Sequence, residues 1–183
     1  MVPETLTTTD LPAPGGEILV REVTALEPEE LADLCLVLRA CVDEGASLGF
    51  HAPMPAAEAE AYWAGLPRPG VTLLVAEADG RVGGTVQLHA EAKANGAHRV
   101  EVAKLLVHPA WRRRGIASRL MGHAEDLARE RGGLLIVLDT REGDVSNLVY
   151  AAAGYQQGGR IPSYARDANG ELSATIYWYK ELM

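Results

Sequence analysis

Three consecutive β-rich segments followed by one long amphipathic helix limit the folds that this chain can adopt. Residues 71–78 and 81–90 are rich in Val, Leu and Thr, and the Asp-Gly pair between them favours a tight hairpin turn. Residues 99–107 form a third β-rich segment, and residues 116–131 have apolar side chains at helical spacing. This order predicts an antiparallel meander that leads into a strand–helix unit.

The flanking segments complete a mixed α/β domain. We expect a first strand over residues 17–23, helices over 28–43 and 55–64, a strand over 134–138, a helix over 145–153 and a hairpin from 160–166 and 172–179. The segment 134–138 is continuously apolar, which is typical of a strand buried on both faces. Because strands and helices do not alternate regularly, the sheet is predicted to be mixed (α+β) rather than doubly wound.

Length and charge restrict the class of protein. The 183 residues suit one domain over 17–183, preceded by a flexible leader rich in Thr and Pro over residues 1–16. The net charge of −8 argues against a nucleic-acid or anionic-membrane binder. No apolar run approaches the roughly 20 residues that cross a bilayer. Cys35 and Cys41 lie on different faces of one predicted helix, as suits a reducing, cytoplasmic location.

The turn before the long helix is unusually basic. Three arginines, Arg112, Arg113 and Arg114, precede the positive end of the helix dipole, and no Ser, Thr, Asp or Asn caps this end. An anion held by the free backbone amides would explain both features, with Gly115 allowing close approach. The alternative is a solvated basic turn. The sequence has neither a Gly-x-Gly-x-x-Gly motif after a strand nor a Gly-x-x-x-x-Gly-Lys-Ser/Thr motif, so Rossmann and P-loop sites are poorly supported.

This turn resembles a known family signature. Residues 112–117 match the Gln/Arg-x-x-Gly-x-Gly/Ala pattern of the GNAT acetyltransferases. The preceding Leu-Leu-Val-His-Pro of residues 105–109 and the following Tyr-Ala-Ala-Ala-Gly-Tyr of residues 150–155 are also similar, and the resemblance extends over residues 17–182. It implies a central, mostly antiparallel mixed sheet that is splayed between the fourth and fifth strands and flanked by helices.

The family resemblance implies acetyl-CoA as co-substrate and assigns residues to it. The pyrophosphate would lie on Arg112, Arg113, Arg114, Gly115, Ile116, Ala117 and Ser118, and the pantetheine arm along Leu105, Leu106 and Val107. Many members have an Asn seven residues before the helix Tyr, where this chain has Gly143. Asp144, Ser146 and Asn147 are the candidate substitutes. No His/Cys/Asp cluster has metal-ligand spacing, so no metal is expected.

Acetyl transfer to an amine requires removal of a proton and protonation of the leaving thiolate. The resemblance makes Tyr150 the general acid; the alternative is a tyrosine that fills the core. Glu101 and Asp139 are both candidates for the general base. Glu101 could instead form a salt bridge with Lys104 or Arg99. Asp139 follows the apolar strand, where partial desolvation is expected, but it could also be a capping or loop acid.

Several residues are candidates for acceptor binding, namely Phe50, His51, Asp139 and Tyr164. The sequences of residues 45–50, 134–140 and 159–164 also resemble the tabtoxin-resistance branch of the family, which implies a toxin- or antibiotic-like amino acid as acceptor. The expected function is direct transfer of an acetyl group from acetyl-CoA to a primary amine of a small molecule, by a monomer or homodimer. The alternatives are acetylation of a protein N-terminus or lysine, and a non-catalytic acyl-CoA sensor.

Overall fold

The computed structural model describes residues 11–46, 48–167 and 170–183. Within these residues, four α-helices, two short 3₁₀ helices and seven strands follow one another. They are β1 (Leu19–Val23), α1 (Pro28–Asp43), α2 (Ala56–Trp63), β2 (Val71–Ala78), β3 (Arg81–Ala90), η1 (Ala94–Gly96), β4 (Arg99–Val107), η2 (Pro109–Trp111), α3 (Ile116–Glu130), β5 (Leu135–Arg141), α4 (Ser146–Ala152), β6 (Gln156–Arg166) and β7 (Leu172–Glu181).

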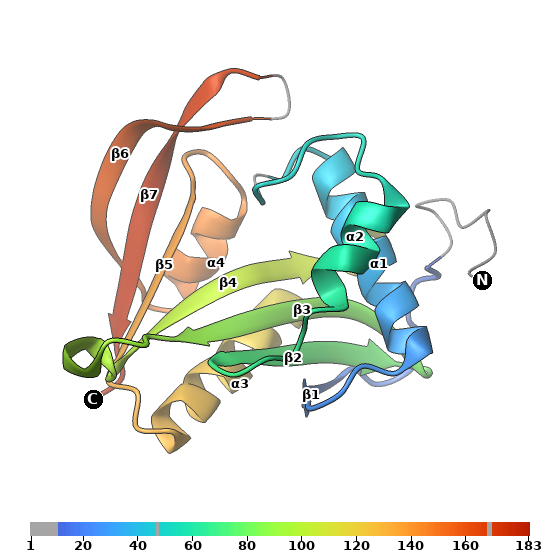
Figure 1. The fold of residues 1–183 in the computed structure, drawn as a ribbon, viewed down its shortest axis with the longest axis horizontal. Helices are drawn as coiled ribbons and strands as arrows, with labels where there is room; N and C mark the ends of the chain where they lie inside the picture. The colour runs from blue at the N-terminus through green and yellow to red at the C-terminus, as the bar shows by residue number, and fades with distance from the viewer. Residues whose placement is uncertain (1–10, 47, 168–169) are drawn as a thin grey trace.

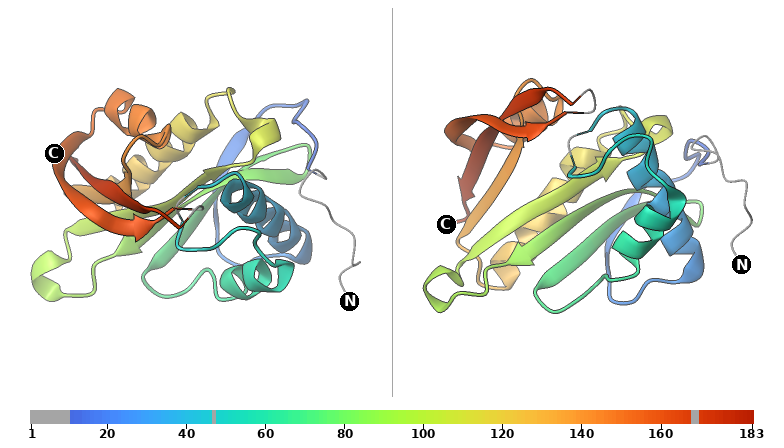
Figure 2. Two further views of the ribbon diagram at one scale, coloured as in Figure 1. Left: turned by 90° about the horizontal axis from the view of Figure 1, so that it is seen from above. Right: turned by 45° about the horizontal axis from the view of Figure 1, so that its top comes forward.

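The seven strands form one mixed sheet in the order β1-β2-β3-β4-β5-β7-β6. Every neighbouring pair is antiparallel except β4 and β5, which are parallel. Helices α1 and α2 cover one face of the β1–β4 half, and α3 and α4 lie on the opposite face (Figures 1 and 2). The predicted mixed, mostly antiparallel fold is confirmed.

The sheet divides where β4 meets β5, and we call this point the fork. The parallel pairing joins only Arg99, Val100 and Glu101 to Leu135, Ile136 and Val137. Beyond Glu101 the two strands diverge, as the ribbon shows (Figure 1). The edge of β4 from Val102 to Val107 that faces β5 therefore has no strand partner within the described residues. The predicted splay between the fourth and fifth strands is confirmed.

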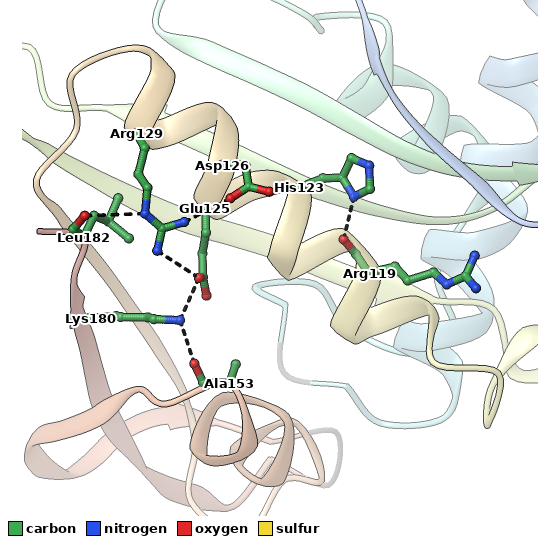
Figure 3. Close-up of polar contacts among 8 residues, drawn as sticks. All are labelled: Arg119, His123, Glu125, Asp126, Arg129, Ala153, Lys180 and Leu182. Carbon is green, nitrogen blue, oxygen red and sulfur yellow. Dashed lines mark hydrogen bonds and ion pairs between the residues drawn. The ribbon is translucent and has the colours of Figure 1, made fainter.

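An ionic network around the buried Glu125 fixes α3 against the β5–β7 half of the molecule. The Glu125 carboxylate accepts a hydrogen bond from Lys180 Nζ at 2.6 Å and lies 3.6 Å from Arg129 (Figure 3). Lys180 also donates to the Ala153 carbonyl at 2.7 Å, at the C-terminal end of α4. A cation at this end of the helix dipole is favourable. The network therefore connects α3, β7 and α4, and so helps to hold α4 at the fork.

Three expectations are corrected by the structure. Leu11 is 1% exposed, Trp111 Nε1 donates to the Pro12 carbonyl, and the amides of Gly15 and Gly16 donate to Asp79. Residues 11–16 thus pack on the domain and are not part of a free leader; residues 1–10 lie outside the described residues, as do Ser47 of the 45–50 loop and Ala168 and Asn169 of the last turn.

The other two corrections concern strands. Leu134 is 49% exposed and precedes β5, and Leu135 and Val137 are only half-buried. The interpretation of residues 134–138 as buried on both faces is therefore wrong. The reason is that α1 and α2 cover only the β1–β4 half (Figure 2). Strand β6 begins at Gln156 rather than at residue 160, because the polar residues 156–159 pair with the edge of β7.

Candidate active site

The basic turn ends in an exposed group of backbone donors. Arg113 has φ +60° and Gly115 has φ +73°, so two left-handed residues flank Arg114. Successive N–H groups in such a turn converge into an anion-binding nest. No acceptor for the amides of residues 113–118 occurs in the described part of the chain, and α3 has no side-chain cap. Six free donors at a helix N-terminus suit a phosphate group.

The side chains of the turn differ in their contacts. Arg112 Nη1 forms a salt bridge with Glu44 at 2.6 Å, and Arg112 Nε donates to the Val107 carbonyl at 3.1 Å. Its guanidinium is thus bound to the protein, on the side of α1. Arg113 and Arg114 are exposed and have no ion pair within the described residues. Ile116 is 2% exposed, so only its backbone faces the turn.

The open edge of β4 leads away from this turn. Leu105, Leu106 and Val107 are the last residues of β4, and Leu106 is buried. Because β5 has diverged, the backbone groups along this edge can accept an extended ligand as a further strand would. The edge and the basic turn are close in the chain, and the edge forms one side of the opening between β4 and β5 (Figure 1).

A β-bulge interrupts the edge at Lys104. Gln87 pairs with Ala103 and Thr85 pairs with Leu106, so Lys104 and Leu105 both lie opposite Val86. Lys104 has φ +52°, a left-handed conformation. Bulges of this kind occur next to active sites, where they re-aim a side chain. Sequence reasoning treated Lys104 only as a partner for Glu101.

The two candidate bases line a common pocket of about 310 Å³. Glu101 and Asp139 are joined there by Lys104, Arg141 and Tyr164. Both carboxylates are exposed, so the expected desolvation of Asp139 is wrong. The reason is that Asp139 lies beyond the part of β5 that pairs with β4, and that α1 and α2 cover only the β1–β4 half of the sheet (Figure 2). Asp139 Oδ2 accepts a hydrogen bond from Thr175 at 2.8 Å.

Glu101 is not paired in the way the sequence suggested. Arg99 forms its salt bridge with Glu91, and Lys104 Nζ donates to the Leu48 carbonyl at 3.0 Å. Within the described residues the Glu101 carboxylate has neither a hydrogen bond nor a salt bridge. Its cross-strand neighbour is His89. Burial lowers the pKa of His89, while the charge of Glu101 opposes this effect.

Tyr150 lies on α4 and is buried, with 6% of its surface exposed. Its ring packs against those of Tyr155 and Trp178, at centroid distances of 5.9 and 6.4 Å. Burial raises the pKa of the Tyr150 phenol well above its ordinary value, and the charge of Asp144 raises it further. The phenol therefore remains protonated at neutral pH.

The loop before α4 is fixed by its own polar groups. Asn147 Nδ2 donates to the carbonyls of Arg141 and Asp144, and Asn147 Oδ1 accepts from Trp178. The Asn147 amide is thus occupied by protein groups. Ser146 Oγ lies 2.8 Å from Thr140 Oγ1. Gly143 has φ +80° and forms the turn of this loop.

The acceptor-side candidates divide between two adjoining pockets. Tyr164 lines the pocket of Glu101 and Asp139, and its hydroxyl lies 2.9 Å from that of Tyr177. Phe50 and His51 line a second pocket of about 300 Å³. The two pockets share Leu48, Gly49 and Ala165 in their walls. Described residues of the loop after α1 and of the β6–β7 hairpin therefore contribute to the walls of both pockets.

Sequence reasoning missed several residues of this region. Thr175, Arg141 and Lys104 line the pocket with the two carboxylates. Lys104 gave the one available signal, since a charged residue between Val102 and Leu106 interrupts an apolar strand. In the described part of the chain, no group of His, Cys, Asp and Glu side chains could hold a metal ion, and no helix has the length and apolarity needed to span a membrane.

Comparison with known proteins gives a consistent result. Residues 38–155 match the model of the acetyltransferase (GNAT) family. The chain is 33% identical over 129 residues to an uncharacterized N-acetyltransferase encoded in the hisH-hisA intergenic region of Azospirillum brasilense, covering 69% of this chain and 77% of that protein.

Two solved structures are similar over most of their length. An N-acetyltransferase from Staphylococcus aureus Mu50 superposes with a TM-score of 0.78 at 15% identity, covering 91% of this chain and 99% of that one. The putative acetyltransferase yncA from Salmonella typhimurium, solved with its cofactor acetyl-CoA, gives 0.74 at 17% identity, covering 91% and 95%. With the match to the family model over more than half of its residues, this chain belongs to the GNAT family of acetyltransferases.

Proposed function

We propose that the protein transfers the acetyl group of acetyl-CoA directly to a primary amine of a small molecule. The observation that carries this proposal is the arrangement around the fork. The nest of free amides at residues 113–118 follows the C-terminal end of the open β4 edge, and the pocket with two carboxylates is lined by the other end of that edge, residues 102–104. One ligand can therefore extend from the nest to the pocket.

The donor side of the fork suits coenzyme A. The nest and the exposed side chains of Arg113 and Arg114 would hold the pyrophosphate, and the edge of Leu105 to Val107 would pair with the amides of the pantetheine arm. Arg112 would act mainly through its contacts with Glu44 and the Val107 carbonyl, which fix the start of the turn. Ser146 and Asn147 would contribute to cofactor binding indirectly. Their side chains contact Thr140 and Arg141 and so fix the loop before α4.

The transfer itself is a displacement at the thioester carbonyl. The amine nitrogen forms a bond to the carbonyl carbon, the carbon–sulfur bond breaks, and the electron pair leaves on sulfur. Glu101 or Asp139 accepts the proton that the amine loses, and the phenol of Tyr150 donates a proton to the thiolate. Holding both substrates in one site supplies much of the rate enhancement, because the reaction becomes effectively intramolecular.

The size of the pocket favours a small acceptor over a protein. About 310 Å³ is at the lower end of the range for small-molecule sites, about 300–1,000 Å³. Each of the three segments that resemble the tabtoxin-resistance branch contributes to the lining of this pocket, through Leu48, Asp139 and Tyr164. This supports an amino-acid acceptor related to toxins or antibiotics.

A screen of amines tests the proposal. The protein is incubated with acetyl-CoA and a panel of amino acids, amino-acid amides, diamines and peptides with a free N-terminus, and thiol release is followed. We expect release with small amines and little with peptides. Thermal stabilisation by acetyl-CoA without release for any amine would favour the acyl-CoA sensor. Faster release with peptides than with amino acids would favour a protein acceptor.

A further inference from the structure

The bulge in β4 places Lys104 on an unexpected face of the sheet. In a regular strand, side chains alternate, so Lys104 would lie on the same face as Val102. That face is covered by α3 and its following turn, where Gly133 lies close to Val100. Instead, Lys104 Nζ lies 5.8 Å from the ring of Phe50 and 5.9 Å from that of Tyr62, on the α2 face. The left-handed bulge thus moves a cation from the core to the acceptor pocket.

The Lys104 ammonium group has unused hydrogen-bonding capacity. It has three donors, and among the described residues its one hydrogen-bond acceptor is the Leu48 carbonyl. The two aromatic rings attract the cation through their faces but accept no ordinary hydrogen bond. Burial lowers the pKa of Lys104, and the charges of Asp139 and Glu101 oppose this effect. A half-buried cation with two unfilled donors is well suited to a ligand anion.

The remaining charges of the pocket indicate which group such a ligand carries besides its anionic group. Arg141 also lines the pocket, but its guanidinium lies 3.7 Å from the Asp144 carboxylate. Glu101 and Asp139 provide negative charge within the same walls. A ligand that satisfies both signs has an amine, which the carboxylates attract, and an acidic group, which Lys104 attracts.

From this arrangement we infer that Lys104 binds the carboxylate of the acceptor, so that the enzyme selects zwitterionic amino acids over amines that lack an acidic group. The inference rests on the proposed function and deepens it, because it assigns acceptor selection to one residue. Lys104 acts here in binding and selectivity; the proton transfers remain with Glu101, Asp139 and Tyr150.

Matched acceptors test this role. Each amino acid of the panel is compared with its carboxamide and with the amine left by decarboxylation, for example lysine, lysinamide and cadaverine. We expect the wild-type kcat/KM to be at least tenfold higher for the acid than for the amide. In Lys104→Met the value for the acid should fall about 10- to 100-fold, the range for loss of a charge-assisted hydrogen bond, whereas that for the amide should change less than threefold. Lys104→Arg should restore part of the preference.

Controls separate this role from a structural one. Lys93 is exposed and does not line the pocket, so Lys93→Met makes the same change in net charge and should leave the preference intact. If Lys104 only holds the Leu48 loop in place, Lys104→Met will lower the values for acid and amide equally. That result, or a wild-type enzyme that prefers the amide, would overturn the inference.

A binding measurement distinguishes failure of this inference from failure of the proposed function. If no amine supports thiol release, calorimetry in the presence of coenzyme A compares N-acetyl amino acids with their amides. Tighter binding of the acids by the wild type, lost in Lys104→Met and retained in part by Lys104→Arg, supports a carboxylate site even without turnover. Equal binding of acids and amides refutes it.

Discussion

Replacement of Gly115 by valine should weaken the binding of coenzyme A through the backbone. The residue has φ +73° and ψ 10°, a left-handed conformation that costs an L-residue about 1–2 kcal/mol. A Cβ built at this position has no atom within 4 Å, so the first atom of the new side chain meets no steric conflict with the protein. Because the neighbouring amides have no acceptor within the described residues, we expect the free turn to relax and the ligand to bear this cost.

The expected magnitude follows from that cost. A loss of about 1–2 kcal/mol corresponds to roughly a 5- to 30-fold rise in Kd. Isothermal titration with coenzyme A should measure this rise, whereas S-acetylpantetheine, which lacks the diphosphate, should bind with unchanged affinity. Gly122→Val is the matched control: Gly122 also has free space around its Cβ but lies within α3, so the exchange should leave both affinities unchanged.

Two results would refute the reasoning. An equal loss of affinity for coenzyme A and for S-acetylpantetheine would mean that the turn does not contact the diphosphate. A fall in the free energy of unfolding of the unliganded protein by about 1–2 kcal/mol, with unchanged affinity, would mean that the protein fixes the turn before the ligand binds. Unfolding in urea, measured with and without coenzyme A, separates these outcomes.

The remaining predictions concern catalysis, stability and thiol reactivity. Tyr150→Phe should lower kcat by about 100-fold in steady-state assays while calorimetry shows acetyl-CoA affinity within twofold of the wild type; equal activity would remove the proposed acid. Glu125→Ala leaves Lys180 without its carboxylate and should lower the free energy of unfolding in urea by about 3 kcal/mol. The control is Asp126→Ala, whose side chain is 75% exposed and whose loss should change this free energy by less than about 0.5 kcal/mol. Similar losses in the two variants would mean that the burial of Glu125 does not strengthen its ion pairs. Burial, assisted by the charge of Glu60, raises the pKa of Cys35 to about 11, so its thiolate fraction rises only above pH 9, and its alkylation at that pH, followed by mass spectrometry, should be at least tenfold slower than that of free cysteine.

The fold could be predicted in detail where local chemistry determines it. Strands β2 and β3 begin and end where the Asp79-Gly80 turn and the flanking apolar residues place them. Helix α1 begins at Pro28, because Glu27 and Glu30 form a capping box in front of it. Strand β6 was predicted too short, because Gln156 and Gln157 lack an apolar pattern and depend on pairing with β7.

The candidate site was less predictable because it depends on contacts between distant residues. The signature motif located the basic turn, but only the structure places Glu44 against Arg112, 68 positions earlier in the chain. The bulge at Lys104 depends on how β4 pairs with β3, and the residue pattern of β4 alone does not reveal that pairing. The exposure of Asp139 follows from which half of the sheet the helices leave uncovered.

The parting of β4 from β5 has a thermodynamic consequence for the whole molecule. The two halves of the sheet are joined by three residue pairs between these strands, and each diverging strand exposes backbone groups that a closed sheet would satisfy. A ligand that binds along that edge bridges the halves and replaces the missing ladder. A compound bound there should therefore slow the hydrogen exchange of backbone amides in both halves of the sheet. Binding at the fork can thus be detected from amides that do not contact the ligand.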